Sequence, residues 1–320
     1  MILVTGGAGY IGGIVAERLI DQGKEVVVYD NLSHGHRDVV PSAAVFEQAD
    51  IGDRETLRKI LQHYPIQAVM HFAADALVGE SMQNPGQYFR NNLSSSIALL
   101  EEAQRAGVGR FIFSSSCAIF GNCNASPIAE NAPTDPISPY GESKLGFEKV
   151  LGWFHRIHGM AYFCLRYFNA CGATEARGER HDPETHLIPL VLNVAAGLSE
   201  TIQVFGGDYP TPDGSCIRDY IHVVDLADAH ILALEADPGL SGCYNVGTGQ
   251  GSSVWDVIAV ARRITGRPIR ETVVAPRPGD PPELVADATK IRQRLGWRPQ
   301  NDLESTVRSA WEFNRRNRRA

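Results

Sequence analysis

The chain has 320 residues, of which 43% are hydrophobic, and its formal net charge at pH 7 is −7. This length and apolar content allow a large buried core and favour two domains. The negative charge argues against nucleic acid or an anionic membrane as the main partner, and no apolar run is long enough to span a bilayer. Because the first predicted strand begins at residue 2, we expect no signal peptide.

The first thirty residues have the order of a dinucleotide-binding βαβ unit. Residues 2–5 are an apolar run that predicts a buried parallel strand, and residues 14–22 predict a helix. A second apolar run at 25–29 leads directly into Asp30. The turn between the first strand and the helix contains Gly6, Gly9 and Gly12. Glycines let the backbone turn tightly and approach a pyrophosphate, which the N-terminus of the helix then binds.

The acidic residue after the second strand selects the cofactor. Asp30 can accept hydrogen bonds from the hydroxyls of an adenosine ribose and would repel a 2′-phosphate. The first arginine that follows it is Arg37, so no cation stands beside it to hold such a phosphate. We therefore predict NAD as the cofactor, in preference to NADP.

Strand and helix patterns alternate through the first half of the chain. Strands are predicted at 44–48, 68–72, 110–114 and 162–167, and helices at 54–63, 83–106 and 140–158. This alternation predicts an α/β fold with a doubly wound parallel sheet of the Rossmann type. Ligands bind beyond the carboxyl ends of such strands, where the polar segments Ser114–Ser116 and Tyr167–Asn169 lie.

The second half is less regular. Residues 172–184 are polar, and loops are predicted at 205–216 and 276–282. Helices are predicted at 186–196, 225–235, 253–265 and 302–317, and strands at 220–223 and 243–246. The basic residues 315–319 suit the solvated end of the last helix. The segment with these two strands could rejoin the first sheet. We therefore expect an NAD-binding domain of residues 1–169, joined by about 219–247, and a smaller C-terminal α/β substrate domain formed by the remainder of 170–320.

Three polar side chains predict proton-transfer chemistry. Tyr140 and Lys144 are four residues apart in a predicted helix and therefore lie on one face. The pKa of a phenol is ordinarily near 10, and a nearby cation favours the phenolate. Ser116 ends the preceding strand and can bind the same substrate oxygen. A Tyr-x-x-x-Lys pair is common by chance, but after a glycine-rich dinucleotide turn it indicates catalysis.

These motifs resemble those of the extended short-chain dehydrogenase/reductase family. Within it, Asp-Tyr-Pro-Thr at 208–211, Arg-Asp-Tyr-Ile-His-Val at 218–223 and Tyr-Phe-Asn at 167–169 resemble the UDP-glucose 4-epimerases, and the likeness covers residues 1 to about 311. Family dehydratases carry Asp-Glu directly after the position of Ser116, and decarboxylases carry Glu at the second position, whereas this chain has Cys117-Ala118. The resemblance therefore implies an isomerase that interconverts UDP-glucose and UDP-galactose through a transient 4-keto sugar.

The resemblance also implies roles for the matching residues. Tyr140 would take the proton of the sugar 4-hydroxyl, Ser116 would position the 4-oxygen and relay the proton, and Lys144 would hold the nicotinamide ribose and tune Tyr140. The implied cofactor-binding set is Gly6, Gly9, Tyr10, Ile11, Gly12, Asp30, Asn31, Asp50, Ile51, Phe72, Ala73, Ala74, Asn91, Ser114, Tyr140, Lys144 and Tyr167. The implied substrate-binding set is Ser116, Tyr140, Asn169, His186, Leu187, Phe205, Arg218, Arg277, Asp280 and Leu284.

Two positions leave substrate range and cofactor binding open. Ala76 stands where many members have a lysine near the nicotinamide. Leu284 stands at a pocket wall where tyrosine restricts the enzyme to hexoses and a small cysteine or serine admits N-acetylated sugars. The alternative functions are a 4-epimerase of UDP-N-acetylglucosamine or UDP-xylose, and a non-catalytic nucleotide-sugar binder.

We expect no metal site, a cytoplasmic location and a homodimer. None of the ten histidines forms a His-Glu-x-x-His or similar set, so we expect no metal. The six cysteines are scattered without a Cys-x-x-Cys pair, which suits a reducing cytoplasm, and Cys117 reads as a packed small residue. As in the family, the helices at 83–106 and 140–158 are expected to pair across a twofold axis in a homodimer.

Overall fold

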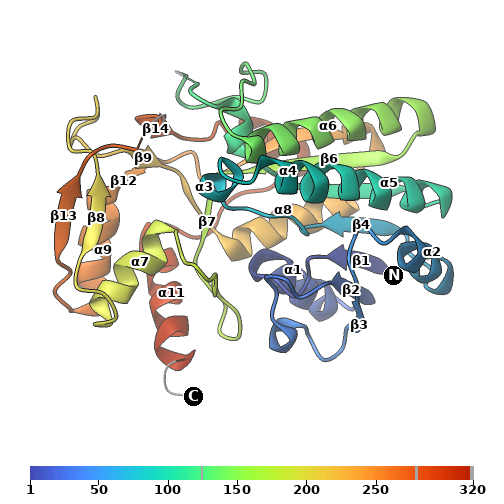
Figure 1. Cartoon of the computed structure of the whole chain (residues 1–320), viewed down its shortest axis with the longest axis horizontal. Helices are drawn as coiled ribbons and strands as arrows, with labels where there is room; N and C mark the ends of the chain where they lie inside the picture. Colours follow the sequence, from blue (N-terminus) through green and yellow to red (C-terminus); the bar gives the residue numbers. More distant parts are fainter. Residues whose placement is uncertain (124, 278–279, 318–320) are drawn as a thin grey trace.

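A seven-stranded parallel sheet forms the larger half of the molecule (Figure 1). The computed structural model describes residues 1–123, 125–277 and 280–317. The strand order is β11-β6-β5-β4-β1-β2-β3. The strands are β1 (Ile2–Thr5), β2 (Val26–Asp30), β3 (Val45–Gln48), β4 (Ala68–His71), β5 (Arg110–Ser116), β6 (Ala161–Tyr167) and β11 (Gly242–Val246). The predicted α/β class with a doubly wound parallel sheet is confirmed.

Two layers of helices cover the sheet because its strands are apolar on both faces. On one face α1 (Tyr10–Asp21) packs beside α8 (Val223–Glu235), and both contribute to one hydrophobic cluster. On the other face the cluster is formed by α2 (Arg54–His63), α5 (Ser96–Arg105) and α6 (Pro139–His158). The glycine turn follows β1 at the carboxyl ends of the strands.

The helix predicted at 83–106 is interrupted in the structure. It consists of α4 (Pro85–Tyr88), a π-helical segment η2 (Phe89–Ser95) and α5. The Asn92 amide in η2 donates to the backbone oxygen of Asp75 at 2.9 Å and to the Ser143 hydroxyl of α6 at 3.3 Å. Sequence periodicity does not distinguish a π turn inside a helix, and such turns are frequent at functional sites.

The smaller half is built from short sheets and helices (Figure 1, left). Parallel strands β8 (Ile202–Phe205) and β13 (Glu271–Val274), which we did not predict, lie beside α7 (Leu187–Ala195), α9 (Val254–Thr265) and α11 (Leu303–Asn317). Ser253 caps α9 in a capping box with Asp256. A three-stranded sheet has the order β12-β9-β14, with β12 (Ser252–Ser253), β9 (Ile217–Arg218) and β14 (Glu283–Leu284).

Only one of the two strands expected to return to the first sheet does so. β11 pairs with β6 in parallel, but β10 (Tyr220–His222) pairs with β7 (Asn169–Cys171) in a separate two-stranded sheet. This small sheet lies at the junction of the two halves. The remaining short helices are η1 (Arg37–Val39), α3 (Val78–Ser81), η3 (Cys117–Phe120), η4 (Pro238–Leu240) and α10 (Thr289–Leu295).

Two expectations fall partly outside the described residues: positions 278–279 of the predicted loop 276–282, and positions 318–319 of the basic end. Across residues 1–123, 125–277 and 280–317, no helix has both the length and the apolar character that a bilayer crossing requires. All six cysteines are free thiols.

Candidate active site

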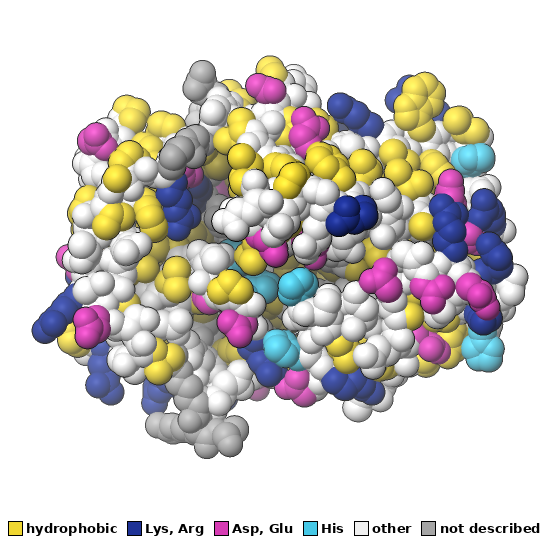
Figure 2. All heavy atoms as spheres, in the orientation of Figure 1, with side chains coloured by type: hydrophobic (Ala, Val, Ile, Leu, Met, Phe, Trp, Pro, Cys, Tyr) yellow, Lys and Arg dark blue, Asp and Glu magenta, His cyan; other side chains and the backbone are white. Residues whose placement is uncertain are grey.

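The carboxyl ends of the parallel strands place most of the predicted cofactor residues along one edge of the sheet. The order β3-β2-β1-β4-β5-β6 is also the order of these residues across the sheet. From one side to the other they are Asp50 and Ile51 after β3, Asp30 and Asn31 at β2, Gly6 to Gly12 after β1, Phe72 to Ala74 after β4, Ser114 in β5 and Tyr167 in β6. Figure 2 shows the surface hollowed between the two halves of the molecule, with histidine side chains near the hollow.

The glycine turn forms a backbone cradle that a side chain would fill. Gly6 has a φ of +73°, and a Cβ there would lie 2.5 Å from the backbone nitrogen of Ala73. A Cβ on Gly12 would lie 2.3 Å from the carbonyl oxygen of Gly6. No side chain caps α1, whose N-cap residue is Gly9, so its first N–H groups face the cradle. The cradle therefore suits a pyrophosphate at the helix N-terminus.

The Asp30 carboxylate is fixed beside the cradle. It is buried, with Oδ2 accepting from the backbone nitrogen of Ala8 at 3.0 Å and Oδ1 accepting from that of Leu32 at 2.8 Å. Each oxygen keeps lone-pair capacity for a ribose hydroxyl. The Arg37 guanidinium lies over the Phe46 ring, 4.4 Å from the ring centroid. These residues suit the adenosine of NAD.

Ser116 and Tyr140 meet at the end of β5. Ser116 ends the strand and caps η3 by accepting from the backbone nitrogen of Ala118 at 3.2 Å. Tyr140 lies in the first turn of α6, which Ser138 caps. Burial raises the pKa of Tyr140 to about 12, although a hydrogen bond with Ser116 lowers it. In the protein alone Tyr140 is therefore a neutral phenol held against the serine hydroxyl.

Lys144 lies one helical turn after Tyr140, as the four-residue spacing predicts. Its Nζ donates to the carbonyl oxygen of Ser114 at 2.8 Å and lies 5.7 Å from the centre of the Tyr140 ring. Burial lowers the pKa of Lys144 to about 7, although Glu148 and Asp75 oppose this shift. Its protonation state therefore responds to charge placed nearby.

A buried ion pair continues the same face of α6 and was missed from the sequence. Glu148, one turn beyond Lys144, accepts from Arg166 of β6 at 2.7 and 3.0 Å and from the Ser115 hydroxyl at 2.5 Å. Both side chains of the pair are less than a tenth exposed. The spacing of Tyr140, Lys144 and Glu148 could have revealed it, since residues at i, i+4 and i+8 share a helix face.

A second polar network behind the cradle gives no signal in the sequence. The His71 ring lies 2.7 Å from the Thr5 hydroxyl and 2.8 Å from the Ser96 hydroxyl, and it is fully buried. Burial lowers the pKa of His71 to about 3, so the ring is neutral. Its partners come from β1 and α5, far apart in the chain. Near it, the predicted cofactor residue Asn91 donates to Asn92 in the π-helical segment.

The two predicted substrate-binding arginines lie on either side of Asp280, which pairs with Arg218 and donates its backbone nitrogen to Arg277 O. Arg218 is buried in β9, where it donates to Ile217 O and pairs with Asp280. The Arg277 guanidinium lies 4.0 Å from the centre of the Phe205 ring. Burial raises the pKa of the Cys117 thiol, next to Ser116, to about 12, and Arg218 opposes that rise. Cys117 therefore stays a neutral thiol.

Asp219 anchors this part of the site and was not singled out from the sequence. Its buried carboxylate accepts from Thr248, Gly249 and Ala286, and its backbone oxygen accepts from the predicted substrate residue Asn169 at 2.8 Å. These bonds tie β9 to the chain after β11. Leu284, in β14 beside Arg218, packs against the cluster that contains Phe120, Leu145 and Phe168.

His186 is held by carboxylates at the start of α7, directly before Leu187. Its Nδ1 lies 2.7 Å from Glu179 and 2.9 Å from Glu184. Burial lowers the pKa of His186, but these two hydrogen bonds outweigh burial and raise the pKa to about 10. His181 also contacts Glu179, at 2.9 Å. Carboxylate and imidazole side chains, which are common metal ligands, thus meet here. The expectation of no metal was based on the absence of a His-Glu-x-x-His pattern, which this group does not need.

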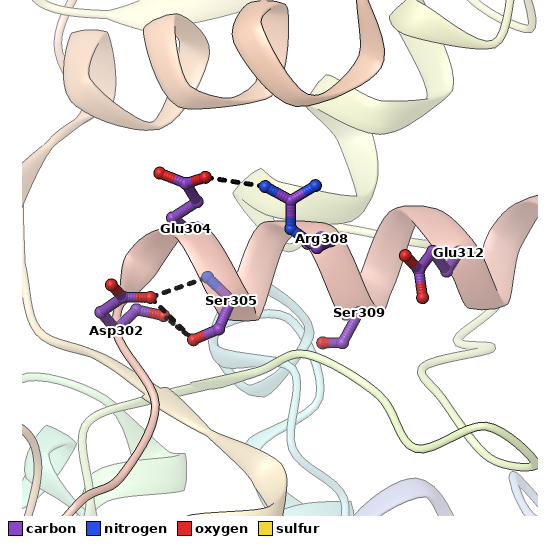
Figure 3. A pocket seen from close by; sticks show the side chains of 6 residues that line it. All are labelled: Asp302, Glu304, Ser305, Arg308, Ser309 and Glu312. Atoms are coloured by element: carbon purple, nitrogen blue, oxygen red, sulfur yellow. Dashed lines mark hydrogen bonds and ion pairs between the residues drawn. The ribbon is translucent and has the colours of Figure 1, made fainter.

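A separate surface groove at the start of α11 does not belong to this site. Figure 3 shows its lining side chains, which come from one helix and the residue before it: Asp302, Glu304, Ser305, Arg308, Ser309 and Glu312. Arg308 pairs with Glu304 at 2.7 Å, and Asp302 accepts from Ser305. None of the predicted site residues lines the groove.

Proteins of known function and solved structure are similar to this chain in sequence and fold. Residues 2–247 match the family model described as the NAD dependent epimerase/dehydratase family. A UDP-glucose 4-epimerase of Streptomyces lividans is 48% identical over 315 residues, covering 98% of this chain and 95% of that protein. One of Halalkalibacterium halodurans is 47% identical over 319 residues, with the same shares covered. The crystal structure of UDP-glucose 4-epimerase from Brucella ovis in complex with NAD superposes with a TM-score of 0.94 at 44% identity, covering 98% of each chain. The chain therefore belongs to the NAD-dependent epimerase/dehydratase family and, within it, to the group of the UDP-glucose 4-epimerases.

Proposed function

We propose that the chain is an NAD-dependent isomerase that interconverts UDP-glucose and UDP-galactose through a transient 4-keto sugar. The observation that carries this proposal is the meeting of Ser116 and Tyr140, with Lys144 one turn away, at the strand edge beside a dinucleotide cradle. A pure binder has no need of a tyrosine held beside a serine and backed by a buried lysine. The absence of an acid at 117 and 118 favours epimerisation over loss of water.

Each residue of the site has a separate role in this proposed reaction. Tyr140 removes the proton from the sugar 4-hydroxyl and returns it, while Ser116 holds the 4-oxygen and relays the proton. Lys144 holds the nicotinamide ribose. NAD bound in the cradle supplies the hydride acceptor for C4 and a positive charge near Tyr140. Arg218 and Arg277 hold the diphosphate while the keto sugar turns, because a guanidinium can bind phosphate oxygens with two bonds at once.

The remaining predicted residues are assigned in the same way. We assign Asn169, Leu187 and Asp280 to the nucleotide sugar, and Phe205 to the face of the uracil. His186 lies beside them at the start of α7. We divide the chain into an NAD-binding domain of residues 1–169 with about 219–247, and a UDP-sugar-binding domain made of the rest. Six free thiols support a cytoplasmic location.

Turnover of UDP-galactose tests the function. The purified chain should form UDP-glucose from UDP-galactose, measured by a coupled UDP-glucose dehydrogenase reaction after the epimerase has been removed by filtration. A panel with UDP-N-acetylgalactosamine and UDP-arabinose separates the hexose epimerase from the alternatives. Binding of UDP without turnover of any of these sugars would instead support a nucleotide-sugar binder.

Leu284 is expected to set tolerance for the acetamido group. Leucine is smaller than tyrosine and larger than cysteine, and its neighbours Phe120, Leu145 and Phe168 form a buried apolar wall. An apolar pocket discriminates a small added volume by about 1–3 kcal/mol. We expect slow turnover of UDP-N-acetylgalactosamine by the unchanged chain, abolished by Leu284→Tyr, with hexose turnover largely retained. Equal loss of both activities would mean that position 284 supports the site's structure.

A homodimer is the second part of this proposal. Phe89 of the π-helical segment and Trp153 and Ile157 of α6 are 38%, 56% and 67% exposed. The π-helical segment and α6 pack against each other on one side of the molecule, and both carry exposed apolar side chains (Figure 1). Pairing of this side across a twofold axis would bury it in a four-helix interface.

Light scattering at micromolar concentration should therefore give twice the mass of the 34.9 kDa chain. Trp153→Glu should shift the mass toward a monomer, because a charge buried in the interface would be unpaired. Val273→Glu, at an equally exposed position on β13, should leave the dimer intact. A monomeric unchanged chain would contradict the proposal.

A further inference from the structure

Four side chains of the kinds that bind metal ions meet in the loop between β7 and α7. Glu179, His181, Glu184 and His186 lie within eight consecutive residues, and one ligand atom from each lies within 4.8 Å of all the others. Of these residues, only His186 has a place in the predicted substrate site. The loop is thus a second cluster of titratable groups, which the epimerase mechanism does not explain.

The distances in this cluster are close to those of a coordination shell. The Glu179 Oε1 atom is 2.9 Å from His181 Nδ1 and 2.7 Å from His186 Nδ1, and Glu184 Oε1 is 2.9 Å from His186 Nδ1. Ligand atoms on a tetrahedral zinc ion are about 3.3 Å apart, from metal–ligand bonds near 2.0–2.1 Å. These three pairs would therefore need to separate by about 0.4–0.6 Å to admit the ion, and all four donor atoms already lie within 4.8 Å of one another.

The environment favours a cation at the point where these atoms converge. The Glu179 and Glu184 side chains are 7% and 15% exposed, so two carboxylates are largely removed from water. Arg180, between Glu179 and His181 in the sequence, pairs with Asp38 at 2.6 Å. The two histidine side chains are 35% and 39% exposed, which leaves an entry path for an ion.

We propose that Glu179, His181, Glu184 and His186 form a binding site for a divalent transition-metal ion, with zinc as the probe. Two imidazoles and two carboxylates suit zinc in a tetrahedral arrangement and also suit other first-row divalent ions. The proposal does not depend on the epimerase activity. It revises the expectation of no metal, which considered only helical ligand spacing.

A metal ion at this site would hold the two halves of the molecule together. The same loop reaches the larger half through Arg177, which donates to Val39 O at 2.8 Å and pairs with Glu17 of α1. The His181 ring also packs edge-on against Tyr10, next to the glycine turn, with centroids 6.5 Å apart. A bound ion would fix this loop against the cradle and hold His186 by its ring.

Zinc binding to the chelator-treated, purified chain tests the proposal. We expect one zinc ion per chain by equilibrium dialysis and a zinc-dependent rise in melting temperature. Glu179→Gln and His181→Gln should each weaken binding at least tenfold and remove most of the thermal shift. Glu175→Gln in the same loop and His63→Gln elsewhere are exposed control variants, and both should bind as the unchanged chain does.

Cobalt substitution separates this site from the one other group of this type in the described residues, Glu148 with Cys164 and Cys243. Cobalt at the loop should give only weak d–d bands, since its ligands are nitrogen and oxygen. A strong thiolate charge-transfer band would place the metal at the cysteines and overturn the proposal. Absence of stoichiometric zinc, or undiminished binding in both Glu179→Gln and His181→Gln, would also overturn it.

Discussion

Tyr140→Phe should lower epimerisation by about 100- to 10,000-fold, the usual contribution of a general acid–base group. Only the hydroxyl that exchanges the proton with the sugar is removed, and the ring keeps its packing against Tyr88, 6.4 Å away in an edge-on contact. Binding of NAD and UDP should stay close to that of the unchanged chain, because the cradle and the arginines are untouched. The rate is measured as UDP-glucose formed from UDP-galactose, and binding by calorimetry.

Tyr64→Phe is the matched control for this variant. It removes a hydroxyl that donates to Glu47 at 2.8 Å, after α2 and away from the catalytic edge. Its turnover should be unchanged. If Tyr140→Phe turned over UDP-galactose at nearly the normal rate, the phenol would not be the proton-transfer group, whatever the control showed.

Glu148→Gln should lower the free energy of unfolding by about 3–5 kcal/mol, because it leaves the buried Arg166 without a counter-charge. Burial lowers the pKa of Arg166, but its bonds to Glu148 outweigh burial and raise it, so the guanidinium stays charged and has to be compensated. The ordered Ser115 hydroxyl would lose its carboxylate acceptor as well. Urea denaturation at pH 7 measures the loss.

A double substitution shows whether the loss arises from the pair. Glu148→Leu with Arg166→Met removes both charges, so it should cost clearly less than the sum of the two single changes. Glu55→Gln breaks the exposed Glu55–Lys59 pair and should change stability by less than about 0.5 kcal/mol. A similarly small effect of Glu148→Gln would mean that Arg166 finds another partner or water.

Local patterns were enough to predict the larger half. The strands of the sheet, the glycine turn and the Tyr140–Lys144 spacing are all encoded by neighbours within a few residues. Residues that follow parallel strands share one edge, so the position of the cofactor residues could be inferred once the strands were recognised. The family resemblance supplied the substrate and the roles, which the pattern alone did not contain.

The features that were missed depend on partners far apart in the chain. His71 bonds to Thr5, 66 residues away, and β8 pairs with β13 across about seventy residues. The π turn at Phe89–Ser95 depends on what Asn92 reaches in α6, and the two-residue strands β9, β12 and β14 are too short to show alternation. Nothing in a single local window distinguishes these from ordinary helix or loop.

The return of β11 to the sheet has a consequence for how the chain folds during synthesis. Gly242–Val246 pairs with β6 along its whole length, yet it is made only after the first part of the smaller half, which includes α7 and β8. Until then β6 is an open edge with unpaired backbone groups, which is prone to wrong pairing. The larger half therefore cannot complete its sheet until β11 has been made, after α7 and β8 of the smaller half and before α9 and α11. A nascent chain stalled before residue 242 should need protection by a chaperone, whereas one stalled after 247 can close the sheet.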